Sequence, residues 1–188
     1  MVDKTFEKME YAAFGGEGDE FEACRFQGCE FSSAGLGGTL FSGCRFESCN
    51  LSLAVMKGAT LKDVVFSHCK LMGIDFSACN KFLFSPSFHH CMMHYTLFAA
   101  LNLRKMRFEH CDLREADFSG SDLSGAVFEA CDLPGTVFYR TLLENADLST
   151  ARYYSIDPEQ NSIRGAHFSL PGIVGLLDKH GIRIDYTG

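Results

Sequence analysis

The chain has 188 residues, with 24 acidic and 17 basic side chains and a formal net charge of -7. This length suits one domain or one elongated repeat array, and a second full domain is not expected. The negative balance disfavours direct binding to nucleic acid or to an anionic membrane, because clustered Lys and Arg side chains supply that binding.

The N-terminal residues 1–7 lack the basic flank and the apolar stretch of a secretory signal. No uninterrupted apolar segment approaches the roughly 18 residues that a membrane span needs. We therefore expect a cytoplasmic protein that has no membrane partner.

A first repeat begins at Phe21, from which every fifth residue is large and apolar. A helix would show spacings of three and four, and an ordinary strand would alternate in twos. Strict period five predicts instead a solenoid whose flat sides each take one pentapeptide. The series is Phe21, Phe26, Phe31, Leu36, Phe41, Phe46, Leu51, Met56, Leu61, Phe66, Leu71 and Phe76.

The repeat breaks at residues 80–87, and the next series starts with its frame shifted by two residues. One interpretation is a kinked coil that absorbs the extra residues and still buries Phe82 or Phe84. The other is a projecting apolar loop that contacts a partner, since loops on rigid scaffolds often carry function. The side chains in question are Lys81, Phe82, Leu83 and Phe84.

A second series runs from Phe88 to Leu148, and in both series the residue two positions before the central one is generally small. Both positions are therefore expected to point inward. The second series is Phe88, Met93, Phe98, Leu103, Phe108, Leu113, Phe118, Leu123, Phe128, Leu133, Phe138, Leu143 and Leu148.

Residues 116–120 and 121–125 read Ala-Asp-Phe-Ser-Gly and Ser-Asp-Leu-Ser-Gly. Here the chain resembles the pentapeptide-repeat family, and the resemblance covers about residues 20 to 150. It implies an all-β fold, a right-handed quadrilateral β-helix with four pentapeptides per coil. Residues twenty apart would then stack about 4.8 Å apart, in roughly six coils and a rod on the order of 30 Å long.

This stacking rule predicts ladders of identical side chains. Phe26, Phe46 and Phe66 form one ladder, Phe98, Phe118 and Phe138 another, and Leu103, Leu123 and Leu143 a third on an adjoining wall. In the second half Phe and Leu alternate along the chain. Phe is therefore expected on two opposite walls and Leu on the other two.

All nine Cys residues fall at the small inward position, which predicts buried small hydrophobes rather than disulfides. Two thiol ladders are expected, Cys29, Cys49 and Cys69, and Cys91, Cys111 and Cys131. His89, His90, Cys91 and His94 suggest a zinc site, but Cys91 points inward and no second ligand group completes tetrahedral coordination.

No phosphate-binding glycine loop, nucleophile elbow or Walker-type lysine is present. We therefore expect no metal, no cofactor, no catalytic residue and no small-molecule substrate. The protein is predicted not to be an enzyme.

The sequence divides into a solenoid, residues 1–153, and a C-terminal capping or dimerisation module, residues 154–188. Ser169 and Pro171 begin a short helix that Gly181 ends, and a short strand is expected at 182–184. An open coil end invites aggregation unless it is covered, which favours a two-fold dimer over a simple cap. The expected interface is Ile173, Leu176, Leu177, Ile182 and Ile184.

Residues 157–185 also resemble the C-terminal module of quinolone-resistance (Qnr-type), microcin-immunity and albicidin-immunity pentapeptide proteins. Those relatives are dimers that bind DNA gyrase. The resemblance implies a homodimer whose partner is gyrase, with topoisomerase IV as a second candidate, and which protects the enzyme from a quinolone, microcin or albicidin.

Residues 109–150 carry nine acidic and two basic side chains, and the rest of the chain is balanced. An outward acidic face of Asp112, Asp117, Asp122, Asp132 and Asp147 is therefore expected, and it predicts a non-catalytic DNA mimic that binds gyrase. Two alternatives remain open: a solvated face that only maintains solubility, and a general protein-protein interaction scaffold with no topoisomerase role.

Overall fold

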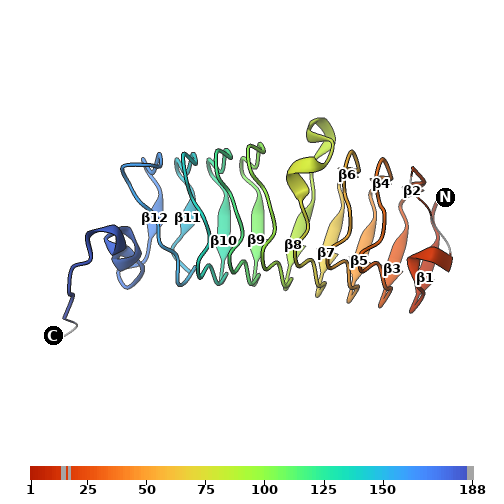
Figure 1. Ribbon diagram of the computed structural model, residues 1–188, viewed down its shortest axis with the longest axis horizontal. Coiled ribbons are helices and arrows are strands. Elements are labelled where there is room, and N and C mark those ends of the chain that lie inside the picture. Colours follow the sequence, from red (N-terminus) through yellow and green to blue (C-terminus); the bar gives the residue numbers. More distant parts are fainter. Residues whose placement is uncertain (14–15, 17, 186–188) are drawn as a thin grey trace.

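The computed structural model describes residues 1–13, 16 and 18–185. The backbone forms a right-handed quadrilateral coil that stacks into a rod, with the N-terminal coil at one end and short helices at the other (Figure 1). The predicted fold class is confirmed. All strand pairs are parallel, because each coil repeats the path of the coil before it.

The strands are short because each spans one side of the square. Nine of them form one sheet in the order β1-β3-β5-β7-β8-β9-β10-β11-β12, and β2-β4-β6 form a second sheet. In the part of the chain that the structure describes, five short 3-10 helices, η1 to η5, interrupt or follow the coil. The bounds are β1 (Thr5–Glu7), η1 (Tyr11–Ala13), β2 (Glu20–Glu22), β3 (Arg25–Gln27), β4 (Leu40–Ser42), β5 (Arg45–Glu47), β6 (Thr60–Lys62), β7 (Val65–Ser67), η2 (Phe76–Ala78), η3 (Lys81–Leu83), β8 (Ser87–His89), β9 (Arg107–Glu109), β10 (Val127–Glu129), β11 (Asp147–Leu148), β12 (His167–Phe168), η4 (Gly172–Leu176) and η5 (Asp178–His180).

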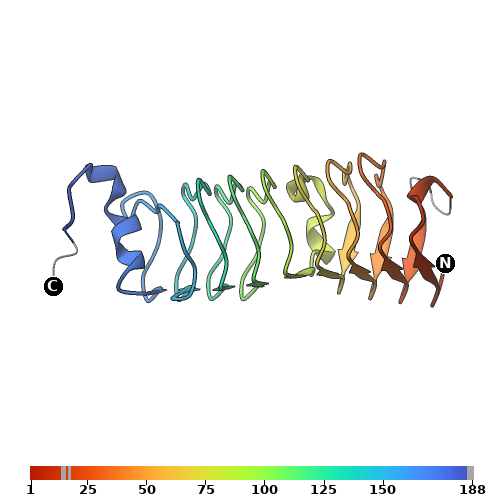
Figure 2. The same cartoon turned by 90° about the horizontal axis from the view of Figure 1, so that it is seen from below.

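The register between coils is twenty residues, except at the break. Phe26 pairs with Phe46, and Phe108 pairs with Phe128. Phe66 pairs instead with Phe88, so this coil holds two extra residues. The frame shift read from the sequence is therefore an insertion that leaves the ladder of the nine-stranded sheet unbroken. Figure 2 shows the coils evenly spaced on both sides of it.

We number the four walls in chain order, and each buries its own column of central residues. Wall 1 carries Phe21, Phe41, Leu61, Leu103, Leu123 and Leu143. Wall 2 carries Phe26, Phe46, Phe66, Phe88, Phe108 and Phe128. Wall 3 carries Phe31, Leu51, Leu71, Met93, Leu113 and Leu133. Wall 4 carries Leu36, Met56, Phe76, Phe98, Phe118 and Phe138. All of these side chains are buried.

The phenylalanines of walls 2 and 4 fill the interior between them. On wall 4, the rings of Phe98 and Phe118 stack with their centroids 4.9 Å apart, and those of Phe118 and Phe138 stack at 5.6 Å. Phe108 of wall 2 meets Phe118 edge to face, at 5.8 Å and 79°. Stacked and T-shaped pairs are the two arrangements that ring quadrupoles favour. The predicted alternation of Phe and Leu walls is confirmed.

The rod is longer than the roughly six coils expected, because coils form at both ends beyond the clear repeat. Phe6 pairs with Phe26 at the N-terminal end, and β12 extends the sheet to Phe168 at the other. About eight turns result, or roughly 40 Å at the usual spacing between strands. The division of the chain at residue 153 stays a prediction, although the ladder continues past that point.

All nine cysteines are free and buried, as predicted. The two expected thiol ladders are one, since the insertion places Cys91 next to Cys69. Eight of the nine thiols, all except that of Cys79, donate to a carbonyl of the preceding coil, as Cys69 does to Phe46 at 3.4 Å and Cys131 to Phe108 at 3.4 Å. Burial raises the pKa of the Cys44 thiol to about 11. The Cys44 thiol is therefore a poor nucleophile in the folded chain.

Each coil turns its corners through residues with left-handed backbone, which explains the Gly at the fifth position of the best repeats. Gly120 and Gly125 have φ of 66° and 69°, but many corners use other residues, such as Ala130 with φ of 48°. A left-handed conformation costs a residue with a Cβ roughly 1–2 kcal/mol. The corners are therefore strained wherever Gly is absent.

Ala130→Gly is expected to raise the free energy of unfolding by about 0.5–1 kcal/mol. Gly removes the strain of the left-handed backbone, and part of this gain is offset because Gly also increases the conformational entropy of the unfolded chain. Ala126→Gly is the matched control, because Ala126 is buried and is not left-handed. That change is expected to destabilise the protein. Urea unfolding of both variants checks the opposite signs, and two destabilised variants would contradict the account of the corners.

Candidate functional site

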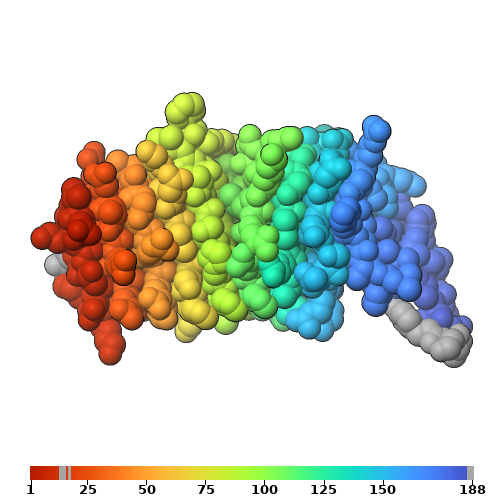
Figure 3. Space-filling model, turned by 180° about the vertical axis from the view of Figure 1, so that it is seen from behind, coloured from red at the N-terminus to blue at the C-terminus, as the bar shows by residue number. Residues whose placement is uncertain are grey.

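The two-residue insertion forms a turn that lies between η2 and β8 in the chain and projects from the rod beside β6. Phe82, at its tip in η3, is 90% exposed, and Leu83 is partly exposed. Phe84 turns inward instead, with its ring 6.1 Å from that of Phe76. Phe84 is therefore partly buried, as the first interpretation expects, and Phe82 projects; contact of Phe82 with a partner stays a prediction. Figure 3 shows the yellow-green projection standing above the surface of the rod.

The projecting turn is fixed at both ends by polar contacts. The Asn80 side chain accepts from the Phe82 amide at 3.1 Å and donates to the Thr60 hydroxyl at 3.2 Å. At the other end the Ser85 hydroxyl accepts from the Asp63 amide at 2.8 Å. Because both ends are held, the Phe82 side chain is displayed on a defined support.

The five aspartates of the predicted acidic face do not share one wall. Asp112 and Asp132 stack on wall 3. Asp117 lies on wall 4, Asp122 on wall 1 and Asp147 on wall 2. Five residues make one side of the square, so aspartates five apart face in different directions. The five aspartates therefore form a belt around the rod, and the expectation of a single acidic face is wrong. A partner-binding role for these residues stays a prediction.

Most of these aspartates also have partners within the chain. Asp122 lies 3.1 Å from Arg104, Asp132 lies 3.0 Å from Arg152, and Asp112 lies 2.7 Å from the His94 ring. Asp117 and Asp122 accept from the amides two residues on, at 2.7 and 3.0 Å. The aspartate of the repeat therefore accepts a hydrogen bond within its own turn. Where it also forms an ion pair, its charge is partly neutralised and interacts less with an outside partner.

Wall 2 carries a small ionic network. Glu109 accepts from the His89 ring at 2.8 Å and from Arg107 at 2.6 Å, and Arg107 also contacts Glu129. The hydrogen bond from His89, together with that from Arg107, lowers the pKa of Glu109. The carboxylates of β9 and β10 are accordingly neutralised in part.

Three imidazoles stack on the corner between walls 2 and 3, which the sequence analysis missed. The rings of His68 and His90 lie 4.8 Å apart, and those of His90 and His110 lie 4.6 Å apart, with interplanar angles of 5°. Reading the chain in steps of twenty, with two added across the break, would have found this column. Among the described residues no group of three or more His, Cys, Asp or Glu is arranged to hold a metal ion.

The C-terminal segment forms two consecutive 3-10 helices, η4 and η5, that lie across the last coil. Ser169 accepts from the Gly172 amide at 3.1 Å, and Gly181 ends η5 with φ of 58°. The strand expected at 182–184 is absent from this part of the chain as described. Residues 186–188 of the predicted module lie outside the described residues.

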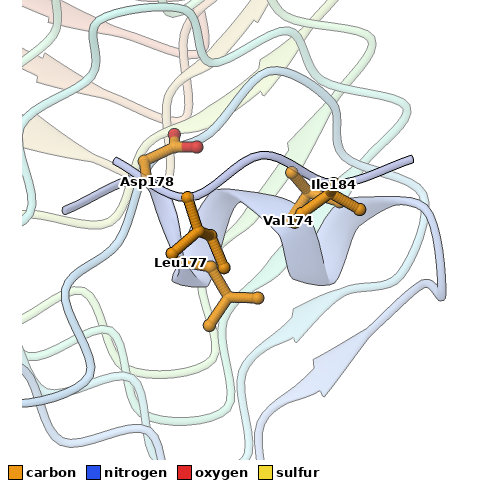
Figure 4. A pocket seen from close by; sticks show the side chains of 5 residues that line it. Val174, Leu177, Asp178 and Ile184 are labelled. Carbon is orange, nitrogen blue, oxygen red and sulfur yellow. The ribbon is translucent and has the colours of Figure 1, made fainter. Parts of the chain in front are cut away.

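The predicted interface residues are partly exposed on these helices and on the segment that follows. Ile173, Leu177, Ile182 and Ile184 are exposed, whereas Leu176 packs against the core. Figure 4 shows Leu177, Val174 and Ile184 around one hollow, with Asp178 at its edge. An apolar surface is therefore present where dimerisation is predicted, and its partner stays a prediction.

Two glycines allow η4 to lie directly on Tyr154. The amide of Ile156 donates to the Gly175 carbonyl at 2.9 Å, and any Cβ at Gly175 would overlap the Tyr154 carbonyl oxygen. A Cβ at Gly172 would overlap the Tyr154 hydroxyl. The spacing of three between these glycines places both on the side of the helix that meets the coil.

None of the helices in the described residues has the length and apolar character needed to cross a membrane.

Comparison with known proteins agrees with this geometry. The family model described as "Pentapeptide repeat region" matches residues 19–82, and the model described as "Pentapeptide repeats (8 copies)" matches residues 93–129 and 121–152. Together these matches cover about two thirds of the chain. No curated protein matches it.

Among solved structures, a trypsin-treated variant of QnrB1, a plasmid-mediated fluoroquinolone resistance protein, is 22% identical, with a TM-score of 0.50 over 98% of each chain. Full-length QnrB1 is 22% identical, with a TM-score of 0.40 over 97% of this chain and 99% of that one. HetL, a pentapeptide repeat protein involved in heterocyst differentiation regulation in the cyanobacterium Nostoc sp. strain PCC 7120, is 15% identical, with a TM-score of 0.31 over 90% and 85%.

Proposed function

Because the chain belongs to the pentapeptide-repeat family, we propose that it is a non-catalytic protein that binds a type II topoisomerase, DNA gyrase, and protects it from a poison such as a fluoroquinolone. The observation that carries this proposal is the filled rod. Its apolar and thiol side chains line the interior, and what varies from coil to coil is the outer surface. Such a protein acts through the surface it presents to another macromolecule.

Three features support gyrase as the partner. QnrB1, a similar solved structure, is a fluoroquinolone resistance protein. The sequence of residues 157–185 resembles the C-terminal module of pentapeptide proteins that bind gyrase. The belt of carboxylates at residues 109–150 gives about two coils of the rod a negative potential. A surface that binds DNA carries clustered Lys and Arg side chains, and these are attracted to negatively charged groups such as the carboxylates of the belt.

Phe82 and the C-terminal apolar surface complete the proposal. An exposed aromatic side chain on a fixed support is the kind of residue that dominates binding energy at interfaces. A two-fold dimer through Ile173, Leu177, Ile182 and Ile184 would cover the exposed apolar side chains of the C-terminal end. The dimer would then present the two rods pointing away from each other.

The test is binding to purified gyrase, with fluoroquinolone-induced DNA cleavage as the second readout. The native protein is expected to bind and to reduce cleavage. The variant with Asp112, Asp117, Asp122 and Asp132 changed to Asn is expected to associate about tenfold more slowly or worse, through loss of electrostatic steering. The control changes Glu10, Glu22, Glu30 and Glu47 to Gln and removes four charges from the other end of the rod. A native protein that does not bind gyrase refutes the proposal.

A general interaction scaffold with no topoisomerase role is the second candidate. The observation that favours it is the pairing of Asp122 with Arg104 and of Asp132 with Arg152, since neutralised carboxylates do not make a continuous phosphate-like track. Binding to another protein that is insensitive to salt, without binding to gyrase, would support this candidate.

A further inference from the structure

Wall 4 differs from the other walls in the column of outward side chains that precede its central residues. Reading from coil to coil, this column is Val55, Asp75, Leu97, Asp117 and Val137. Backbone bridges join Asp75 to Leu97, Leu97 to Asp117, and Asp117 to Val137. Apolar and acidic residues therefore alternate from one coil to the next, and like residues recur about every 9.6 Å, twice the spacing between strands.

The apolar members of the column are displayed to solvent. Val55 is 55% exposed, Leu97 40% and Val137 45%. The corner between walls 3 and 4 adds Leu53 and Tyr95, which are more than half exposed. By contrast, no large apolar side chain among the described residues of wall 2 is exposed. Wall 4 therefore has apolar area that an interface could bury.

A shallow depression opens in this wall beside the break. Leu53, Val55, Gly73, Asp75 and Ala78 line it, and its volume is about 530 Å³. A Cβ atom at Gly73 would lie 2.7 Å from the Leu53 side chain, so any larger residue at that corner would require Leu53 to move. A protruding side chain of a partner could enter this depression.

The two carboxylates of the column form no ion pair within the described residues. Asp75 and Asp117 each accept from the amide two residues on, at 2.9 and 2.7 Å. Neither takes part in any ion pair found among the described residues, whereas Asp122, Asp132 and Glu109 on the other walls all do. An aspartate that is already paired with Arg offers less to a second cation.

We propose that wall 4, through the column Val55, Asp75, Leu97, Asp117 and Val137, is the surface that contacts the partner, and that the partner presents Lys or Arg side chains about 9.6 Å apart with apolar side chains between them. This inference rests on the proposed function, in which the partner is the basic DNA-binding surface of gyrase. Charge complementarity selects that occupant, because the column itself contains no basic residue.

The test compares two pairs of substitutions that remove the same charge. Asp75→Asn with Asp117→Asn removes both carboxylates of wall 4 and keeps the amide-accepting oxygen of each side chain. Asp122→Asn with Asp132→Asn removes two carboxylates from walls 1 and 3. In binding to purified gyrase, the first pair is expected to raise the Kd at least tenfold and the second less than threefold.

A second comparison tests the apolar half of the column. Leu97→Arg places a like charge against a basic partner, and Leu142→Arg is its control on wall 1, where Leu142 is 44% exposed. Only Leu97→Arg is expected to weaken binding strongly, and the unfolding midpoints of all four variants verify that each is folded. If native protein binds gyrase and the substitutions on wall 4 weaken binding no more than those on walls 1 and 3, this inference is overturned while the proposed function stands. If native protein does not bind, both fall.

Discussion

Phe118→Ala is expected to lower the free energy of unfolding by about 3–5 kcal/mol, the range for removing a buried Phe side chain from a packed core. Phe118 is fully buried, and its ring stacks between those of Phe98 and Phe138. It also meets Phe108 and Phe128 edge to face. The cavity would therefore disturb three successive coils. Thermal unfolding should show a midpoint lower by roughly 10 °C.

Phe82→Ala is the matched control, because the same side chain is removed from a site that is 90% exposed. Surface substitutions of this kind usually change stability by about 0.5 kcal/mol or less. The two variants should therefore unfold at clearly different temperatures. Equal midpoints would mean that the interior is not packed as the ring geometry indicates.

Gly175→Ala is expected to release η4 and η5 from the end of the coil while the repeat stays folded. The added Cβ would overlap the Tyr154 carbonyl, a backbone atom that cannot move aside cheaply. An overpacking cost of about 1–3 kcal/mol raises the open population of the segment roughly fivefold to 150-fold. Trypsin cleavage after Lys179, which lies in η5, should accelerate by a similar factor, since cleavage follows the open population.

Gly35→Ala provides the control for the added methyl group. No atom lies within 4 Å of the Cβ it would create, and its backbone is not left-handed. Size-exclusion chromatography with light scattering then tests the proposed dimer, which Gly175→Ala should dissociate and Gly35→Ala should leave intact. Unchanged proteolysis and unchanged mass for Gly175→Ala would show that η4 does not depend on this contact.

Much of the fold could be predicted because period five is imposed by the coil itself. Every residue that steps by five from Phe21 to Phe76 is buried in the structure. The terminal coils lie outside the clear repeat because their inward positions are atypical. Lys4 and Met9 precede Phe6 and Tyr11 where a small residue was expected. At the other end Asn161 takes that position, and its amide donates to the Phe138 carbonyl at 3.0 Å, as the Thr141 hydroxyl does to Phe118 one coil earlier.

The surface was harder to predict, because residues near in sequence face different directions. Asp112, Asp117 and Asp122 are consecutive in the repeat, yet each step of five crosses a corner to the next wall. Only steps of twenty stay on one wall, and the insertion changes one of them to twenty-two. Side-chain pairing, such as that between Asp132 and Arg152, depends on this longer period. The period of five locates the core, and the period of twenty locates the surface.

Because the register is constant, the rod can lengthen or shorten only by whole coils of twenty residues. Between the projecting turn at residues 81–84 and the C-terminal helices, successive coils pair at a spacing of twenty residues. Gain or loss of one such block would move the two ends by about 4.8 Å relative to each other and leave every wall aligned. Duplication of a single coil is thus a simple evolutionary route by which this architecture could adjust its reach to targets of different size.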